Sequence, residues 1–196
     1  MHSETWRNSL TSTQIDKPEF EGFGKIPRLS RDCVITEKID GTNAQILITD
    51  YGDLFVGSRK KWITPSDDNF GFARWAEENR EEIMKLGPGR HFGEWWGKGI
   101  QRQYGLNEKR FSLFNTSVWG DDSVRPSCCH VVPVIFSCEF STEVVSKAID
   151  RLKTEGSFAS PGYYSPEGII VYHVALNGYF KKTIEGDESP KGSYAN

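Results

Sequence analysis

The chain has 196 residues, of which 37% are hydrophobic and 26% are charged, and its formal net charge is −3 at pH 7. This size and balance fit one soluble domain with a sizeable core, and they exclude a disordered chain and a wholly basic nucleic-acid coat. No apolar run approaches the roughly 20 residues that span a bilayer, and the N-terminus lacks the apolar core of a signal peptide, so we expect a cytoplasmic protein with no membrane partner.

Three strand-like segments come first in the chain. They are "CVITEKI" (33–39), "NAQILIT" (43–49) and "LFVGSRK" (54–60), and the last two flank the turn "DYGD" (50–53). Strands joined by such short connections are most simply antiparallel neighbours in one sheet.

Two later segments have apolar residues at helical spacing. In the segment 69–89 the apolar positions are Phe72, Trp75, Ala76, Ile83 and Leu86. Asp68 or Asn69 can cap its start, and Gly87 with Pro88 ends it. In the segment 141–156 the apolar positions are Val144, Val145, Ala148, Ile149 and Leu152, behind Ser141 or Thr142 as the cap.

The remaining segments read as strands. They are "RHFGEWWG" (90–97), "RFSLFNTSVW" (110–119), "VVPVIFSCEF" (131–140), "EGIIVYHVAL" (167–176) and "GYFKKTIE" (178–185). Many antiparallel strands with two outer helices predict an α+β domain. The polar ends, 1–15 and 186–196, are expected to be loosely held.

The stretch "TEKIDGTN" (36–43) places Lys38 between acidic residues and before a glycine. A lysine amine attacks only when neutral, and its ordinary pKa is about 10.4, so a nucleophilic lysine needs cations or a dry pocket nearby. Lys181 and Lys182 can supply such cations, and Glu167 can supply a hard oxygen ligand for a metal. Taken alone, Lys38 reads more readily as a solvated lysine at the end of a strand than as a nucleophile.

Its companions change that reading. "EKIDG" (37–41) resembles the nucleophile motif of the covalent nucleotidyltransferases, which include ATP-dependent DNA and RNA ligases and GTP-dependent capping enzymes. Elements resembling the other motifs follow in the family's order: "GSRKK" (57–61), "FGEWWG" (92–97), "RFSLFN" (110–115), "EGIIV" (167–171) and "FKKT" (180–183). Within this superfamily, "TEKIDGTN" and "FGEWWGKGIQRQYG" (92–105) are most similar to the bacteriophage-type RNA ligases.

The resemblance implies catalytic roles. Lys38 would attack the α-phosphate of ATP and carry AMP, while Asp40 would orient the lysine or bind metal through water. Glu167 would place Mg²⁺ or Mn²⁺. Lys181, with Lys182, would stabilise the α-phosphate, and we favour Lys181 because neighbouring strand residues face opposite sides.

It also implies how ATP is held. Glu37 would lie near the adenine edge and Phe114 would stack on the base. Glu94 would accept hydrogen bonds from the ribose, and Arg59 would hold ribose or phosphate oxygens. Three of these assignments have a structural alternative: Glu94 as a strand residue beside buried rings, Phe114 as a core residue, and 59–61 as a solvated face. Asn115 stands where the family often has an aspartate.

The implied fold is a single nucleotidyltransferase (adenylation) domain over 1–196, with its core at about 20–186 and antiparallel sheets flanking an ATP cleft, as in the ATP-grasp-like DNA and RNA ligase domains. Nothing after residue 186 suffices for an appended oligonucleotide-binding fold or helical module, so we expect none. The implied partner is RNA, or a nicked duplex containing RNA, with 5′-phosphate and 3′-hydroxyl ends. Residues Asn43, Lys60, Lys61 and Arg102 are predicted to contact it.

The predicted function is ATP-dependent RNA joining through a lysyl-AMP intermediate, by a monomer. The bacteriophage-type resemblance is compatible with a phage-encoded protein acting in a host cytoplasm. Three alternatives stay open: a minimal DNA ligase, a GTP-dependent capping guanylyltransferase, and a nucleotide- or nucleic-acid-binding module without strand-joining activity.

Overall fold

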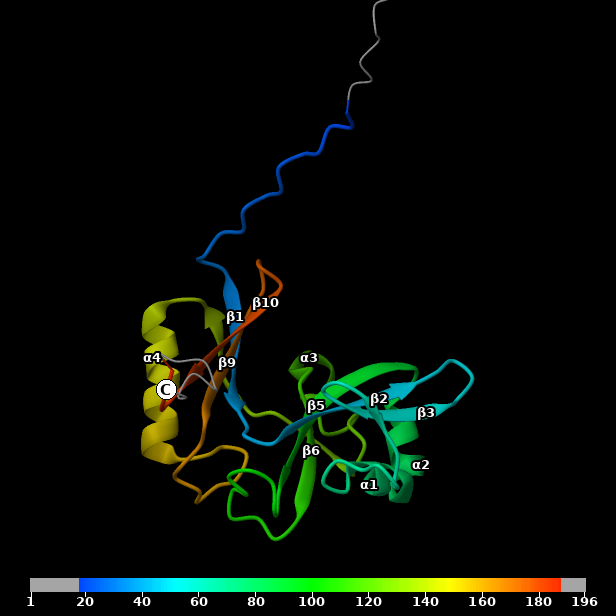
Figure 1. Ribbon diagram of the computed structural model, residues 1–196. Helices are drawn as coiled ribbons and strands as arrows, with labels where there is room; N and C mark the ends of the chain where they lie inside the picture. The colour runs from blue at the N-terminus through cyan, green and yellow to red at the C-terminus, as the bar shows by residue number, and fades with distance from the viewer. Residues whose placement is uncertain (1–17, 188–196) are drawn as a thin grey trace, which may run out of the picture.

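A computed structural model describes residues 18–187, and in this part the chain forms two β-sheets with helices on their outer faces (Figure 1). The predicted loose ends lie outside the described residues, apart from 186 and 187. Residues 18–32 are exposed and the first buried side chain is Cys33, so packing begins later than the predicted core boundary. Among residues 18–187, no helix combines the length and the apolar composition that a membrane crossing requires.

The first sheet, which we call sheet A, is antiparallel. In spatial order its strands are β10 (Gly178–Thr183), β9 (Gly168–His173), β1 (Asp32–Lys38) and β8 (Val134–Glu139). Helix α4 (Thr142–Glu155) covers one face, where Leu152 and Ala148 pack with Ile35 and Ile169. The opposite face of sheet A is turned toward the second sheet.

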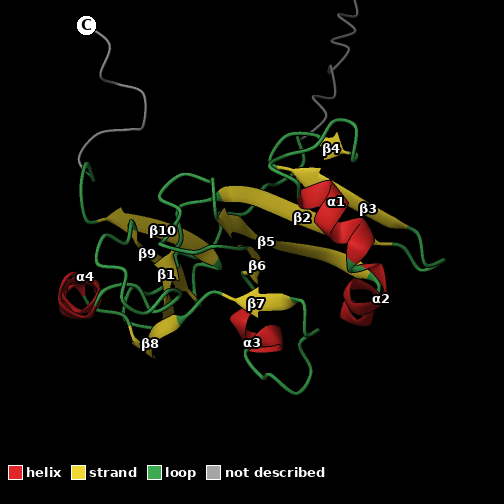
Figure 2. Ribbon diagram, turned by 90° about the horizontal axis from the view of Figure 1, so that it is seen from below, coloured by secondary structure: helices red, strands yellow, loops and turns green. Residues whose placement is uncertain are grey.

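The second sheet, sheet B, has six strands. In spatial order they are β4 (Trp62–Ile63), β3 (Leu54–Ser58), β2 (Thr42–Ile48), β5 (Gly89–Gly97), β6 (Lys109–Leu113) and β7 (Cys129–Val131). All neighbours are antiparallel except β6 and β7, which are parallel. One face packs against α1 (Phe72–Glu78), α2 (Arg80–Ile83) and the 3-10 helix η1 (Met84–Leu86). Figure 2 shows α1 in front of β2 and β3.

The predicted helix at 141–156 is confirmed with its cap. The Ser141 hydroxyl accepts a hydrogen bond from Val144 N at 3.1 Å, and the helix ends before Gly156. The predicted helix at 69–89 is broken at Asn79, whose side chain donates to the Trp75 carbonyl at 2.8 Å. Asp68 still serves its start, because its carboxylate accepts from Ala73 N at 2.8 Å.

Two strand predictions are wrong. Residues 116–119 form the short helix α3 (Thr116–Trp119), because the Asn115 side chain caps it by accepting from Val118 N. The segments 33–39 and 43–49 do not pair: β1 belongs to sheet A and β2 to sheet B. The chain crosses between the sheets at 39–41, where a Cβ on Gly41 would lie 2.5 Å from the Trp95 carbonyl oxygen.

A small apolar cluster fills the junction between the sheets. It contains Ile39, Trp96, Tyr104 and Val132, which come from the crossing segment, β5, the following loop and the segment before β8. The junction is therefore packed, and Lys38 lies directly before it at the end of β1.

Candidate active site

The strand register decides which side chains share the face of Lys38. Cross-strand partners in an antiparallel sheet lie on the same face. Lys38 pairs with Gly168, which pairs with Thr183, and Thr36 is linked in the same way through Ile170 to Lys181. Since residues two apart on a strand share a face, Lys181 lies on the Lys38 side of sheet A.

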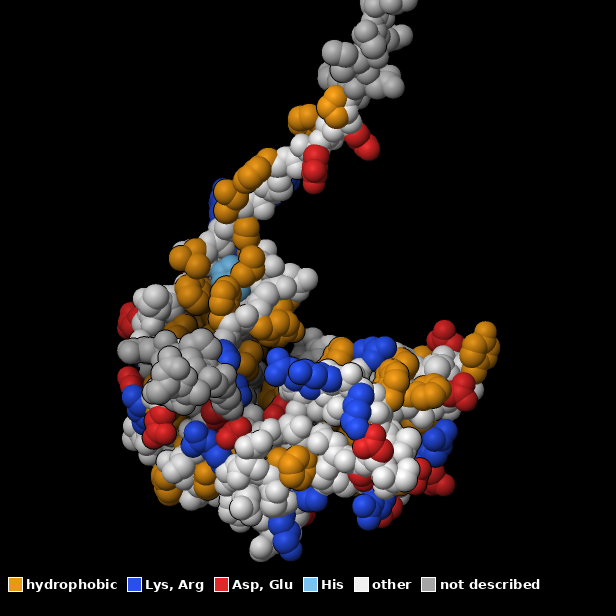
Figure 3. Space-filling view, viewed as in Figure 1, with side chains coloured by type: hydrophobic (Ala, Val, Ile, Leu, Met, Phe, Trp, Pro, Cys, Tyr) orange, Lys and Arg blue, Asp and Glu red, His pale blue; other side chains and the backbone are white. Residues whose placement is uncertain are grey.

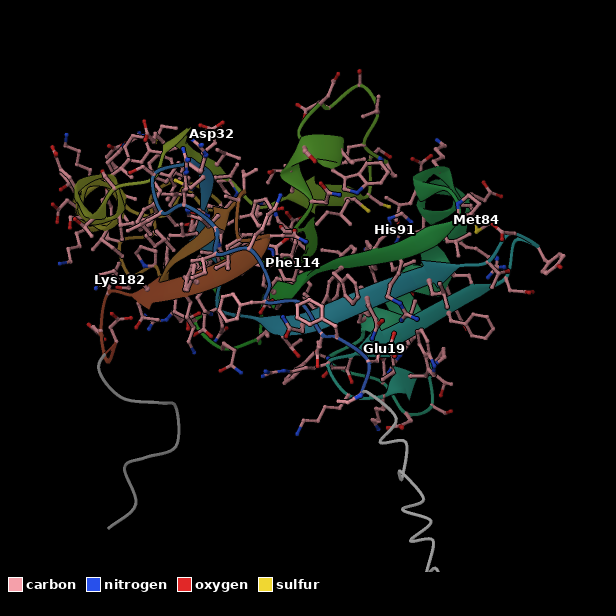
Figure 4. All side chains as sticks on the ribbon, turned by 90° about the horizontal axis from the view of Figure 1, so that it is seen from above. Glu19, Asp32, Met84, His91, Phe114 and Lys182 are labelled. Atoms are coloured by element: carbon pink, nitrogen blue, oxygen red, sulfur yellow. The ribbon has the colours of Figure 1, made fainter. Side chains whose placement is uncertain are left out.

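Lys182 lies on the opposite face. It is in register with Ile169 and Glu37, and its Nζ is 2.9 Å from Asp187 Oδ2. Figure 4 shows it at the outer end of β10, away from sheet B. The register therefore places Lys182 on the face of sheet A away from Lys38, and its Nζ is engaged with Asp187. The assignment of Lys181 to the phosphate stays a prediction, and the register counts against Lys182 in that role.

The Lys38 ammonium contacts Glu167, which directly precedes β9. Lys38 Nζ is 2.5 Å from Glu167 Oε2, and the two side chains are 21% and 3% exposed. Gly168 makes the close packing of β9 and β10 possible, because a Cβ there would lie 2.2 Å from the Lys182 carbonyl oxygen. The sheet thus brings together a lysine and a glutamate that are 129 residues apart.

Glu94, on β5, is a second buried carboxylate near Lys38. It is 8% exposed and accepts from Gly41 N at 3.1 Å and from Asn43 Nδ2 at 2.9 Å. Burial raises the pKa of Glu94 to about 7, while the Lys38 charge opposes this shift and the Glu167 charge adds to it. Lys38 is therefore near both carboxylates. The Asn43 amide, predicted to contact nucleic acid, holds Glu94 in this structure.

Glu37 faces away from Lys38 and holds a loop. Its carboxylate accepts from Ser157 Oγ at 2.6 Å, Phe158 N at 2.8 Å and Ala159 N at 2.9 Å. Burial raises its pKa, and these three hydrogen bonds counteract part of that shift. The predicted contact with the adenine edge stays a prediction, whereas the loop contacts were not foreseen.

Asp40 is tied to the loop after β5. Its carboxylate accepts from Arg102 Nε at 3.1 Å, and Arg102 also donates to the Ser165 carbonyl at 3.1 Å. The backbone N–H of Asp40 donates to the Tyr104 hydroxyl at 2.9 Å, and burial raises the pKa of Tyr104. Arg102, predicted to contact nucleic acid, therefore links the nucleophile motif to Ser165. Tyr104 was missed, although it stands in the "GIQRQYG" run that signalled the family.

Phe114 lies at the end of sheet B that faces sheet A (Figure 4), one residue past β6. Its side chain is 41% exposed, so it is not a core residue. Its backbone N–H donates to the Phe92 carbonyl at 3.0 Å, which continues the ladder between β5 and β6.

The basic residues 59–61 form the turn between β3 and β4. Arg59 follows Ser58, which pairs with Ala44, so it leaves the sheet beside Asn43 and Glu94. Lys60 is exposed, and Lys61 Nζ is 2.5 Å from Asp67 Oδ2. Arg59 and Lys60 therefore lie at the edge of the site, while the charge of Lys61 is matched by Asp67.

Comparison with known proteins supports the fold and identifies the family. The RNA ligase family model matches residues 31–184, a range that includes all ten strands of the described part of the chain. No curated protein matches the chain by sequence.

Solved structures of Naegleria gruberi RNA ligase have a similar fold. A mutant with ATP and Mn has a TM-score of 0.61 at 17% identity, over 80% of this chain and 51% of that chain. A mutant with AMP and Mn has a TM-score of 0.61 at 16% identity, over 79% and 50%. The form with PPi has a TM-score of 0.58 at 16% identity, over 79% and 50%.

The chain thus spans about half the length of these structures, and the likeness confirms the predicted α+β fold class. The family model covers both sheets. The chain belongs to the RNA ligase family.

Proposed function

We propose that the protein is an ATP-dependent RNA ligase that forms a lysyl-AMP intermediate on Lys38. The observation that carries this proposal is the position of Lys38 at the junction of the sheets, near buried Glu167 and Glu94 and on the same sheet face as Lys181. The junction thus combines the Lys38 amine with the Glu167 and Glu94 carboxylates, and Lys181 lies on the same face of sheet A.

In the first step the neutral Lys38 amine attacks the α-phosphorus of ATP. A nitrogen–phosphorus bond forms, the bond to the bridging oxygen of the β-phosphate breaks, and pyrophosphate leaves with the electron pair. Lys181 stabilises the negative charge that develops on the phosphate oxygens, as a fixed cation does in a preorganised site.

The ammonium of Lys38 must first lose its proton. Its Nζ is 2.5 Å from Glu167 Oε2, so this ion pair has to separate before the amine can attack. Weakening that contact when the substrate enters would free the amine for attack.

ATP is held by the groups around this point. Glu94 accepts hydrogen bonds from the ribose hydroxyls, and the exposed ring of Phe114 stacks on the base. Arg59, at the edge of the site, binds ribose or phosphate oxygens. Glu37 acts on the base indirectly in this proposal, through the loop that its carboxylate anchors.

The carboxylates near Lys38 could hold a divalent cation only if substrate oxygens completed its coordination. Within residues 18–187 no group of three or more His, Cys, Asp or Glu side chains could hold a metal. Mg²⁺ commonly takes one or two carboxylates together with substrate phosphates, and Glu167 is the carboxylate that faces Lys38. When bound there, Mg²⁺ or Mn²⁺ would neutralise charge on the phosphates and favour the uncharged amine.

Two further steps complete the joining reaction. An oxygen of the RNA 5′-phosphate attacks the α-phosphorus and the bond to Lys38 breaks, which yields an adenylated RNA end. The 3′-hydroxyl of the second strand then attacks the 5′-phosphorus, and AMP leaves as the phosphodiester forms. The partner is RNA, or a nicked duplex containing RNA, and the active species is a monomer.

The test is covalent labelling. The protein is incubated with α-labelled ATP or GTP and Mg²⁺ or Mn²⁺, denatured, and examined for retained label. Label from ATP that disappears in Lys38→Ala supports the proposal, label from GTP alone indicates a capping enzyme, and no label indicates a binding module. Nicked duplexes with RNA or DNA on each side of the break then separate RNA joining from DNA joining.

A further inference from the structure

The face of sheet B opposite its helices carries an in-register row of side chains. Across neighbouring strands, Trp62 is opposite Gly57, Gly57 is opposite Gln45, and Gln45 is opposite Phe92. Phe114 continues the row, because its N–H bonds the Phe92 carbonyl. At about 4.8 Å between strands, the row spans roughly 19 Å from β4 to β6.

This row is unusually exposed for aromatic side chains. Trp62 is 47% exposed and Phe92 is 52% exposed, and Phe55 on the same face is 47% exposed. The helices α1 and α2 pack on the other face, where Ala44 and Ile46 are buried. Soluble proteins rarely expose large apolar patches, so an exposed group of aromatic side chains of this kind indicates a binding site.

The side chains are held in place before any ligand arrives. A Cβ on Gly57 would lie 3.1 Å from both Trp62 Cε3 and Gln45 Cγ, so the glycine lets the indole lie close to the sheet. The Arg90 guanidinium carbon is 5.3 Å from the Trp62 ring centroid, and Arg90 donates to the Gln45 amide oxygen. The Phe55 and Trp62 ring centroids are 5.9 Å apart.

Basic side chains accompany the aromatic ones on this face. Arg90 is in register with Leu47, which is opposite Phe55, so an arginine lies between the aromatic side chains, while the carboxylate of Glu94 lies two residues beyond Phe92 on β5. The turn that holds Arg59 and Lys60 adjoins Trp62. Figure 3 shows Lys and Arg side chains beside hydrophobic ones on the upper surface of this lobe, next to the hollow between the sheets.

We propose that this face binds an unpaired segment of the RNA substrate. Bases stack on Phe92, Trp62 and Phe55, and Arg90 with Lys60 contacts phosphates. Aromatic side chains displayed on a sheet are an established way to bind single-stranded RNA, because every base offers a ring face and the backbone offers negative charge. Arginine and lysine side chains among exposed aromatic rings favour a nucleic acid over an average protein surface.

The position of the row links it to the joining reaction. Phe92 is two residues before Glu94 on β5, so the row lies one pleat repeat, about 7 Å, from the ribose site. A strand that leaves the junction along sheet B therefore crosses these side chains. The inference rests on the proposed function for the identity of the strand, but the binding itself can be measured separately.

The experiment measures both properties in each variant. Fluorescence anisotropy with a labelled, short single-stranded RNA carrying a 5′-phosphate gives the affinity, and α-labelled ATP gives the rate of Lys38 labelling. The test variants are Trp62→Ala, Phe92→Ala and Arg90→Gln. The matched controls are Tyr51→Ala, a 94% exposed ring at the β2–β3 turn, and Arg74→Gln on α1.

We expect Trp62→Ala and Phe92→Ala each to weaken RNA binding about tenfold, as the loss of one base stack does. Arg90→Gln should weaken it and lower the slope of log affinity against log salt by about one. Lys38 labelling should stay at the wild-type rate in all three, and the two controls should bind RNA like the wild type.

Wild-type RNA affinity in both aromatic variants, with Lys38 still labelled, would overturn this inference and leave the ligase proposal intact. Weaker RNA binding in these variants without any Lys38 labelling would support the inference and overturn the proposed function. A wild-type protein that binds no RNA would overturn the inference, and the face would then be a docking site for protein.

Discussion

The buried carboxyl of Glu94 should make the folding stability depend on pH, in the direction opposite to that of an ordinary ion-paired acid. Burial raises its pKa from 4.5 to about 7. Between these values the folded protein holds a proton that the unfolded chain has lost. The stabilisation that this proton supplies is present below about pH 4.5 and is lost as the pH rises through about 7.

The magnitude follows from the difference between the two pKa values. A tenfold change in proton affinity corresponds to about 1.4 kcal/mol, so the full effect amounts to about 3 kcal/mol of unfolding free energy. Glu37 contributes in the same direction, because burial raises its pKa as well. The contribution of Glu94 alone therefore requires a comparison with a variant.

The variant is Glu94→Gln, which has a similar shape and does not ionise. We expect the unfolding free energy of Glu94→Gln minus that of the wild type to rise by about 2 to 3 kcal/mol between about pH 5 and pH 8. Urea denaturation at several pH values measures this difference. Glu81→Gln, at an exposed position on α2, is the control and should follow the wild type.

A difference that stays constant over this pH range would refute the reasoning. It would mean that Glu94 is solvated in the folded protein, in conflict with its 8% exposure. Glu94 would then lack the dry surroundings in which a hydrogen bond to a ribose hydroxyl is strong.

Four further predictions concern the site. Glu167→Ala should abolish metal-dependent labelling of the nucleophile while circular dichroism stays unchanged, and near-normal labelling would contradict its role. Lys181→Ala should slow labelling about a hundredfold and Lys182→Ala should change its rate less than about threefold, because only Lys181 shares the sheet face of Lys38. Equal rates in the two variants would show that the sheet face does not decide which lysine acts on the phosphate. Gly168→Ala should lower the unfolding free energy measured by urea denaturation by about 1 to 3 kcal/mol, because the added Cβ would clash with the backbone of β10. An unchanged denaturation midpoint would show that β10 shifts to accommodate the methyl group without cost. Raising the salt from roughly 50 to 200 mM should weaken RNA binding far more than it slows labelling by ATP, and RNA binding indifferent to salt would argue against phosphate contacts.

Local signals in the chain predicted the local elements well. The helix α4 has its cap, its apolar spacing and its terminal glycine within one continuous segment, and all three act over a few residues. The short helix α3 was missed because the signal was a single capping residue, Asn115, inside a segment of strand-forming residues. The break at Asn79 was missed because the apolar spacing continues on both sides of it.

The local sequence pattern could not predict which strands pair with one another. A short connection favours a hairpin, yet β1 and β2 separate into two sheets at 39–41. That crossing depends on the tight fit of Gly41 against Trp95 on β5, which lies about fifty residues later in the chain.

The sequence by itself determined the chemistry that is available: a lysine in a nucleophile motif, the carboxylates Glu94 and Glu167, and the family to which their order belongs. Only the tertiary structure decided which groups act together. It placed Lys181 rather than Lys182 on the face of Lys38 and turned Glu37 toward a loop. It also engaged Asn43 with the buried carboxylate of Glu94 and Arg102 with the carboxylate of Asp40. The physical reason is that a motif specifies residue types over a few positions, whereas facing and burial depend on strand register across residues far apart in the chain.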